Sequence, residues 1–449
     1  MNLKNKEKLF SHLARNYDSM DYPPILLYGK VGRQRIRQAW RRRAAQIRKG
    51  AADYPALYVH VPYCQTKCFF CKFRVRVANS PRLTGQYLKC LKGEIEELSP
   101  IFKKVGFKTM YLAGGTPTIL SEPQLEELLG LLEKKFDLST TYQRLIEATP
   151  ATLSPGKLKI LKKHGINRLT IGVQSLDNGL LARMNRKNQN REMVSRVYAQ
   201  ARKTGIEHIN IDLVVGIPGQ SKESFLSDVD YVLGMRPDAL HIFAYEEEEL
   251  VIFYKMGKRI NDADRERRDE MFALADRKII KSGYRTYKGE SYILSMPAAN
   301  YQFLLRYHAN GSLLGLGAKA LSYIPGHYAY QNAQVEEYLA YRSQGKIPPY
   351  VDAYPLDRAE TSINYVVNNI RGGLDKNAFN KLYGRNFDTQ FKGAVNCLKK
   401  LGRIEEKAGT VRLAAKSDLE FRTYSKFFFS PAVIGKLKKS LKYRSGDEI

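Results

Sequence analysis

Short apolar runs alternate with longer amphipathic stretches through the middle of this chain. The runs lie at 56–61, 109–114, 144–148, 167–173, 209–216 and 239–245, and helical spacing marks stretches between them, as at 85–98, 121–136 and 221–235. Six strand–helix units in series predict parallel strands joined by crossover helices, and therefore an α/β fold. The functional side chains of such a barrel gather at the carboxyl ends of its strands.

The alternation fades after about residue 255. A helix is predicted at 264–282, strands or loops at 283–287 and 312–323, and a hairpin at 402–414 within a helical region. We therefore divide the chain into a basic N-terminal extension (1–56), an α/β core (57–255), a core extension with part of the substrate site (256–350) and a winged-helix-like cap (351–449).

Composition limits the function classes. The 449 residues are 43% hydrophobic and 27% charged, which excludes a wholly disordered chain. No apolar stretch is long enough to span a membrane, and MNLKNKEKLF lacks the apolar core of an export signal, so we expect a cytoplasmic protein. The formal net charge of +29 favours anionic partners such as carboxylates or phosphates.

A run of arginines lies at 33–48 within the basic extension. The run predicts either a solvated surface helix or a binding site for an anionic group or partner. Nucleic acid is an unlikely partner, because a basic run alone does not specify it.

Three of the five cysteines, Cys64, Cys68 and Cys71, form a C-x3-C-x2-C pattern. Three thiolates can hold three irons of a [4Fe–4S] cluster, and the fourth iron is then open to a ligand with an amine and a carboxylate. The alternative is a zinc site completed by His60. Cys90 and Cys397 stand alone.

This cysteine pattern, with Phe70 before its last member, resembles the radical S-adenosylmethionine (SAM) superfamily. YVHVPYC at 58–64 resembles, more narrowly, the oxygen-independent coproporphyrinogen III oxidase group, which includes heme chaperones and class C radical methyltransferases. Further matching blocks are AGGTP (113–117), IEATP (146–150), 167–186, 210–220, 315–323 and 330–341. The resemblance implies a partial (β/α)6 TIM-like barrel of the radical SAM type with a mainly helical, winged-helix-like C-terminal domain.

The resemblance also implies the cofactors: a [4Fe–4S] cluster on Cys64, Cys68 and Cys71, and one or two SAM molecules. Its cofactor-binding candidates have separate roles. They are Gly114, Gly115 and Thr116 for the amino group, Arg186 for the methionine carboxylate, Glu147 for the ribose, Phe70 for the adenine, Tyr58 beside the sulfonium, and Gln174 and Asp212 on buried strands where a ligand can satisfy them.

The implied chemistry is reductive cleavage of SAM to a 5′-deoxyadenosyl radical, with an electron from a donor such as flavodoxin or ferredoxin and Tyr58 as the catalytic candidate. The first hypothesis is an enzyme acting on a tetrapyrrole or similar carboxylated substrate. The second is a class C methyltransferase or cyclopropane-forming enzyme using two SAM molecules, and the third is a heme carrier that keeps the cluster.

Three departures separate the chain from the oxidase pattern. Lys72 and Phe73 follow Cys71 where the oxidase has a further cysteine two positions on, and Ala113 replaces a glycine. Tyr307-His308 stands where the heme chaperones have Tyr-Trp. His308 is either an acid, base or heme ligand, or a polar surface histidine.

Overall fold

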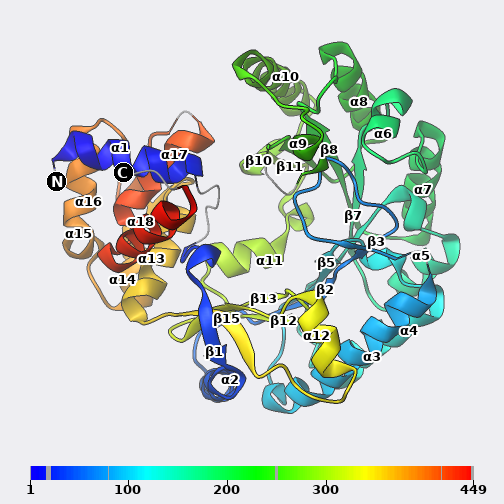
Figure 1. Cartoon of the computed structure of the whole chain (residues 1–449), viewed down its shortest axis with the longest axis horizontal. Coiled ribbons are helices and arrows are strands. Elements are labelled where there is room, and N and C mark those ends of the chain that lie inside the picture. Colours follow the sequence, from blue (N-terminus) through cyan, green and yellow to red (C-terminus); the bar gives the residue numbers. More distant parts are fainter. Residues whose placement is uncertain (1, 17–21, 79, 248–250, 416, 446–449) are drawn as a thin grey trace.

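Six parallel strands form the centre of the molecule (Figure 1). The computed structural model describes residues 2–16, 22–78, 80–247, 251–415 and 417–445. Neighbouring strands pair in chain order: β2 (Ala56–Val61), β5 (Thr109–Gly114), β6 (Gln143–Ala148), β7 (Arg168–Gln174), β8 (His208–Val215) and β9 (Ala239–Ala244). Each coincides with one of the six predicted apolar runs, so that part of the prediction is confirmed.

Helices cover the outer face of these strands (Figure 1). They are α3 (Pro81–Leu98), α4 (Glu122–Lys135), α5 (Pro155–Lys163), α6 (Asn178–Arg183), α7 (Arg191–Thr204), α8 (Lys222–Met235) and α10 (Asp262–Lys281). Side-chain caps fix where several begin: Ser121, Ser154, Asp177, Asn190 and Ser221 each accept a hydrogen bond from a backbone N–H of the first turn. The sequence therefore marks the crossover turns locally.

Antiparallel strands extend both edges of the sheet. Beside β2 lies β12 (Leu313–Leu316), which is parallel to it, followed by the antiparallel strands β13 (Leu321–Ile324), β14 (Tyr328–Gln331), β15 (Tyr350–Pro355) and β1 (Gly29–Gly32). Beside β9 lie β11 (Ser291–Ile293) and β10 (Arg285–Lys288). The uncertain segments 283–287 and 312–323 thus contribute strands, and the turn at 317–320 joins β12 to β13.

The alternation along β2 explains which side chains line the barrel. Leu57, Val59 and Val61 are fully buried in the hydrophobic core beneath the outer helices. Tyr58 and His60 point to the opposite face, because successive side chains of a strand alternate. The alternation along β2 therefore places polar and aromatic side chains in the barrel interior.

The C-terminal region is mainly helical and packs as a second hydrophobic cluster. It includes α13 (Arg358–Asn369), α14 (Lys376–Tyr383), α16 (Lys392–Lys400), α17 (Asp418–Ser425) and α18 (Pro431–Ser445), with strands β16 (Leu374–Asp375), β17 (Ile404–Lys407) and β18 (Thr410–Leu413). The predicted hairpin at 402–414 is confirmed, since β17 pairs with β18. The N-terminal helix α1 (Leu3–Asn16) joins this cluster beside α17, as Figure 1 shows.

Across the described residues, no helix combines the length and the apolar character that a membrane crossing needs.

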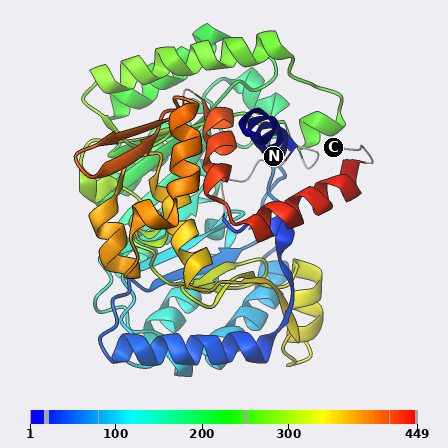
Figure 2. The ribbon, with the colours of Figure 1, turned by 90° about the vertical axis from the view of Figure 1, so that its left-hand side faces the viewer.

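Helix α2 (Arg33–Arg48) is the blue helix along the lower edge of the molecule in Figure 2 and lies outside the sheet. The interpretation of residues 33–48 as a solvated helix is wrong for one face of α2. Trp40 is 1% exposed and donates to the Tyr330 hydroxyl (2.8 Å), while Arg33 is 6% exposed. Arg43 is bonded to the buried carboxylate of Asp53 (2.8 Å). The arginine count alone could not reveal that internal acids neutralise part of the run.

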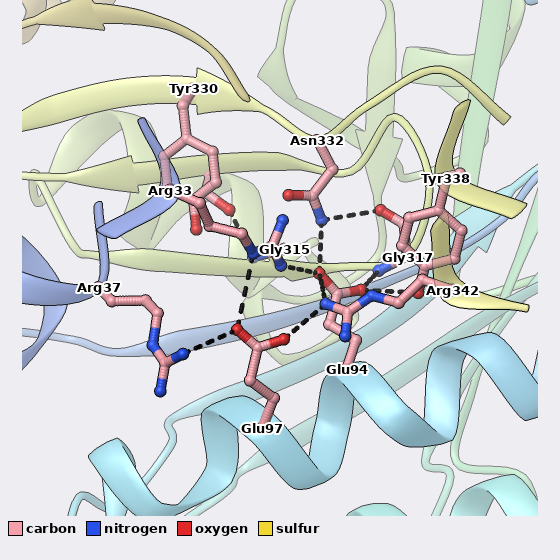
Figure 3. A network of polar contacts seen from close by, with 12 residues as sticks. Arg33, Arg37, Glu94, Glu97, Gly315, Gly317, Tyr330, Asn332, Tyr338 and Arg342 are labelled. Carbon is pink, nitrogen blue, oxygen red and sulfur yellow. Dashed lines mark hydrogen bonds and ion pairs between the residues drawn. The ribbon is translucent and has the colours of Figure 1, made fainter. Parts of the chain in front are cut away.

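On α3, the buried carboxylate of Glu94 contacts this face of α2 and several other elements (Figure 3). It accepts hydrogen bonds from Arg33 (2.8 Å), the backbone N–H of Gly317 (2.7 Å), Asn332 (3.0 Å) and Tyr338 (2.9 Å). Glu97, one helical turn away, is paired with Arg33, Arg37 and Arg342. The network joins α2 and α3 to the turn after β12 and to α12 (Val335–Arg342).

We expect Glu94→Gln to lower the free energy of unfolding by about 3 kcal/mol, because Arg33 would lose the nearer of its two buried counter-charges and keep only Glu97. Urea denaturation of the ligand-free protein measures this. The control is Glu127→Gln, whose pairing with Lys92 is exposed and should matter by less than about 0.5 kcal/mol. Equal stability of the two variants would contradict a structural role for the network.

Candidate functional site

The three cysteines lie in one loop at the carboxyl end of β2. Cys64 ends the short strand β3 (Tyr63–Cys64), and all three thiols are partly buried and free of disulfides. Thr116, just past β5, lies with its hydroxyl 3.4 Å from the Cys64 sulfur. Arg186, from the segment after α6, donates to the Cys68 sulfur (3.6 Å). Residues far apart in the sequence thus converge on the loop.

A second set of contacts fixes the shape of the cysteine loop. The Lys67 ammonium donates to the carbonyls of Cys71 (2.8 Å) and Phe73. Asn185 donates to the carbonyl of Lys67 (3.1 Å), and the backbone N–H of Phe69 donates to the carbonyl of Met184 (3.1 Å). The stretch after α6 therefore holds the cysteine loop in place through hydrogen bonds. No local pattern in the sequence predicts this role for Asn185.

Burial raises the pKa of the Cys64 thiol to about 12 and raises that of Cys71 as well. Neutral thiols are poor ligands, and a bound metal centre deprotonates them. In the ligand-free protein these thiols therefore stay protonated, and binding of a cluster would release their protons.

The zinc alternative finds little support. His60 shares a hydrogen bond with Tyr58 (2.8 Å) instead of facing a thiol. Within the described ranges, no three His, Cys, Asp or Glu side chains converge closely enough to hold a single metal ion. A [4Fe–4S] cluster needs wider spacing, because each cysteine binds a different iron.

Gly114 and Gly115 are required by close approach of neighbouring groups. Gly114 has φ +117°, and a Cβ there would lie 2.8 Å from the His60 ring. A Cβ on Gly115 would lie 2.5 Å from the carbonyl oxygen of Tyr63. Both glycines let β5 pack directly against the approach to the cysteine loop. Their predicted contact with a SAM amino group stays a prediction.

Two buried carboxylates, Glu147 and Asp212, lie on strands of the barrel. Glu147 on β6 accepts a hydrogen bond from the Tyr111 hydroxyl, and Asp212 on β8 accepts one from Asn210 (2.6 Å). Burial, together with the nearby charge of Glu147, raises the pKa of Asp212 to about 7. Burial also raises the pKa of Glu147. Such a pair is suited to accept hydrogen bonds from ligand hydroxyls.

Gln174 and Arg186 each keep a buried polar atom without a hydrogen-bond partner among the described residues: Oε1 of Gln174 and Nε of Arg186. Gln174 also has φ +71°, in the left-handed region. Arg186 is anchored through Nη2 to the carbonyl of Gly172 (2.5 Å) and to Gln189 (2.8 Å). Orphaned polar atoms in a built site are expected to be satisfied by a ligand, so the residues fit a bound SAM.

The remaining candidates lie at the edges of this site. Tyr58 packs edge-on against Tyr111 (5.9 Å between ring centroids), and burial raises its pKa. Phe70 packs against the apolar cluster that includes Leu180 and Ile217. These contacts do not test the ligand roles predicted for Tyr58 and Phe70, which stay predictions.

His308 lies away from the cysteine loop, in the π-helix η6 (Leu304–His308). Its Nδ1 bonds to Asn369 (2.8 Å) on α13, and its ring is edge-on to Phe303. It is therefore a contact between barrel and cap and not the simple surface histidine of one interpretation.

Comparison with known proteins agrees with this geometry. Residues 58–232 match the family described as the radical SAM superfamily. Members of that family use a [4Fe–4S] cluster and SAM. The assignment of Cys64, Cys68 and Cys71 as the cluster ligands of this chain stays a prediction.

The proteins that this chain is similar to carry two kinds of name. The chain is 28% identical to the heme chaperone HemW of Bacillus subtilis, over 81% of this chain and 96% of that protein. It is 29% identical to the oxygen-independent coproporphyrinogen III oxidase of Salmonella typhimurium, over 66% and 67%. The solved coproporphyrinogen III oxidase (HemN) of Escherichia coli, a radical SAM enzyme, superposes with a TM-score of 0.78 at 26% identity, covering 91% and 96%.

These matches confirm the resemblance inferred from the motifs. They also confirm the α/β fold class, with its partial (β/α)6 barrel and its mainly helical C-terminal region.

Cys64→Ala, Cys68→Ala and Cys71→Ala should each abolish the brown iron–sulfur absorption after anaerobic reconstitution, because each removes one iron ligand. Cys397→Ala, on α16 in the C-terminal region, is the matched control and should keep it. Iron and sulfide analysis gives the measurement. A full cluster in the Cys68→Ala protein would refute the ligand assignment.

Asp212→Asn should stabilise the ligand-free protein more at pH 8 than at pH 5. The folded pKa of about 7 lies above the ordinary value near 4, so the folded state holds the proton more tightly and stability falls as the pH rises between these values. Since one pKa unit corresponds to about 1.4 kcal/mol, we expect the gain in urea denaturation to be about 3 kcal/mol larger at pH 8 than at pH 5. A gain independent of pH would show that the carboxylate is not responsible.

Proposed function

We propose that this protein is a radical SAM enzyme that acts on a tetrapyrrole or a similar large substrate bearing carboxylates. Three features support the proposal: the thiol loop at the rim of the barrel, the carboxylate pair inside it and the near full-length similarity to a coproporphyrinogen III oxidase. When bound, the cluster and SAM would supply a 5′-deoxyadenosyl radical that takes a hydrogen atom from the substrate.

The interior also offers a surface for a large ring. On β9, His241 and Phe243 stack with centroids 3.7 Å apart and planes 12° from parallel. They pair in register with Asp212 and Val214 of β8, so His241 shares the face of Asp212. Phe243 is 42% exposed, which is unusual for a large apolar side chain and leaves its ring available for packing.

The residues of the candidate site would have separate roles. Cys64, Cys68 and Cys71 hold the cluster, and Arg186 with Gln174 orients SAM through the atoms that now lack partners. Tyr58 would lie beside the sulfonium of SAM, and Glu147 would accept hydrogen bonds from its ribose. In an oxidative decarboxylation of a propionate, the substrate loses a hydrogen atom and carbon dioxide, a donor such as flavodoxin supplies the electron for SAM cleavage, and an electron acceptor takes the remaining electron.

We expect the reconstituted protein, given SAM, a reductant and coproporphyrinogen III without oxygen, to form 5′-deoxyadenosine together with carbon dioxide. Mass spectrometry of the products measures both. The Cys68→Ala protein is the control and should form neither. S-adenosylhomocysteine in place of carbon dioxide would instead indicate a methyltransferase.

A second candidate is a heme carrier, which the similarity to HemW over 96% of that protein favours. Tight heme binding without substrate-dependent formation of 5′-deoxyadenosine would support the carrier and overturn the enzyme proposal.

A further inference from the structure

Residues 72–77, which we call the exit segment, leave the cysteine loop and expose large apolar side chains. Phe73 is 63% exposed and Val77 is 50% exposed, and Phe73 is the most exposed large apolar side chain among the described residues. Side chains of this kind are usually buried, and where they gather on a surface they mark an interaction site. The exit segment is therefore a candidate docking surface.

Backbone geometry places both side chains beside the cysteines. Strand β4 (Arg76–Val77) pairs with β3, and Val77 lies opposite Cys64 in the register. The carbonyl of Phe73 lies 4.0 Å from the Cys71 sulfur. An exposed apolar residue therefore adjoins each of two cysteines of the loop.

Hydrogen bonds fix the backbone of the exit segment. The Lys67 ammonium donates to the carbonyl of Phe73, and the N–H of Arg76 donates to the carbonyl of Pro62 (2.8 Å). Toward the start of α3, the N–H of Ala78 donates to the carbonyl of Cys64 (3.0 Å). The exposed side chains thus have a defined position, as an interaction surface requires.

Cations alternate with the apolar side chains of the exit segment, which reads Lys-Phe-Arg-Val-Arg-Val and contains no acid. Lys72, Arg74 and Arg76 are all exposed. Two acids from other elements approach: Glu246 pairs with Lys72 (2.5 Å) and Glu336 with Arg76 (3.5 Å). Both ion pairs are exposed and therefore weak, so carboxylates of a partner can compete for these cations.

The position and charge of the exit segment indicate what kind of partner it fits. A cluster on the three cysteines needs electrons from outside the protein, and electron transfer between proteins slows steeply with distance. Flavodoxins and ferredoxins are small acidic carriers of single electrons, and their charge complements that of the exit segment. A second copy of this chain is disfavoured, because each copy carries a formal net charge of +29. Redox encounters also bury little surface, so a few exposed side chains suffice.

We propose that the exit segment is the docking site of an acidic one-electron carrier protein. The side chains of Phe73 and Val77 pack against the carrier, and Arg74 contacts its carboxylates. In the docked complex the reduced carrier loses one electron and the predicted cluster gains it, passing from the 2+ to the 1+ state, with no proton transferred. This inference rests on the proposed function for the presence of a cluster, and it names the surface that receives the electron.

The test uses the anaerobically reconstituted full-length protein and a purified bacterial flavodoxin as the probe. Isothermal titration calorimetry without oxygen gives the dissociation constant. We expect Phe73→Ser to raise this constant about tenfold, because the exposed ring is the main apolar contact. Arg74→Glu should raise it about tenfold at low salt and less at high salt, because salt screens exposed charges. Phe73→Leu should keep most of the affinity.

Tyr350→Ser and Lys159→Glu are the matched controls. The first removes an exposed aromatic ring on β15 and the second reverses an exposed charge on α5, so both should leave the dissociation constant unchanged. Stopped-flow spectroscopy adds a second readout. Reduction of the cluster by flavodoxin hydroquinone should slow in Phe73→Ser, whereas reduction by dithionite, which needs no docking site, should not. Equal iron content in all variants shows that the cysteine loop has folded.

Three results would overturn the docking assignment. If Phe73→Ser weakens binding of coproporphyrin III and not of flavodoxin, the ring is a substrate contact. If the wild-type protein is a dimer that Phe73→Ser dissociates while flavodoxin binding is unchanged, the exit segment joins two copies of the chain. A wild-type protein that does not bind flavodoxin would also contradict the proposal.

The docking assignment and the proposed function fail differently. If the wild-type protein forms 5′-deoxyadenosine and carbon dioxide with dithionite, but Phe73→Ser binds flavodoxin equally well, the docking assignment is wrong and the proposed function stands. If flavodoxin binds through Phe73 but coproporphyrinogen III gives no 5′-deoxyadenosine, the docking assignment stands and the proposed function is overturned.

Discussion

The buried carboxylate of Glu94 is the interaction on which the arrangement of the molecule depends. It has 0% exposure and gathers donors from α2, from the turn after β12, and from Asn332 and Tyr338. A lone charge in this position would be very costly, and its hydrogen bonds with Arg33 and neutral donors make it tolerable. Because Arg33 is far along the chain from Gly317, Asn332 and Tyr338, the carboxylate fixes the antiparallel extension against the barrel.

The same network has a consequence on the other side of the sheet. By holding Gly317, Glu94 sets the turn between β12 and β13, while the Tyr87 hydroxyl holds both this turn and the carbonyl of His60. The inner wall of the site is thus supported by polar contacts outside it. Residues outside the site can therefore decide where its inner wall lies.

Several polar groups in the barrel interior lower the stability of the ligand-free protein. Burial raises the pKa of both Glu147 and Asp212, and the nearby Glu147 raises that of Asp212 further, while Gln174 and Arg186 hold polar atoms that lack partners among the described residues. A chain selected only for stability would replace such groups with apolar ones, whereas sites that bind charged or polar ligands retain them. Beside this interior, the π-helix η6 meets the cap through His308 and Asn369, and π-helical turns are frequent at functional sites.

The sequence by itself determined the elements whose signals are local. The apolar runs predicted β2, β5, β6, β7, β8 and β9, and the C-x3-C-x2-C spacing with its flanking motifs indicated the family and its cofactors. Spacing along one loop or strand suffices for these, because the chemistry lies within a few residues.

Only the tertiary structure decided which distant groups meet. Arg33 is part of an arginine run in the sequence, yet it is buried against Glu94, 61 positions away. Arg186 reaches Cys68, and Gly317 in the turn after β12 lies against His60, because parallel strands bring their carboxyl ends together. Such pairings depend on strand order and on the hydrogen bonds that fix each turn, and no local pattern encodes either.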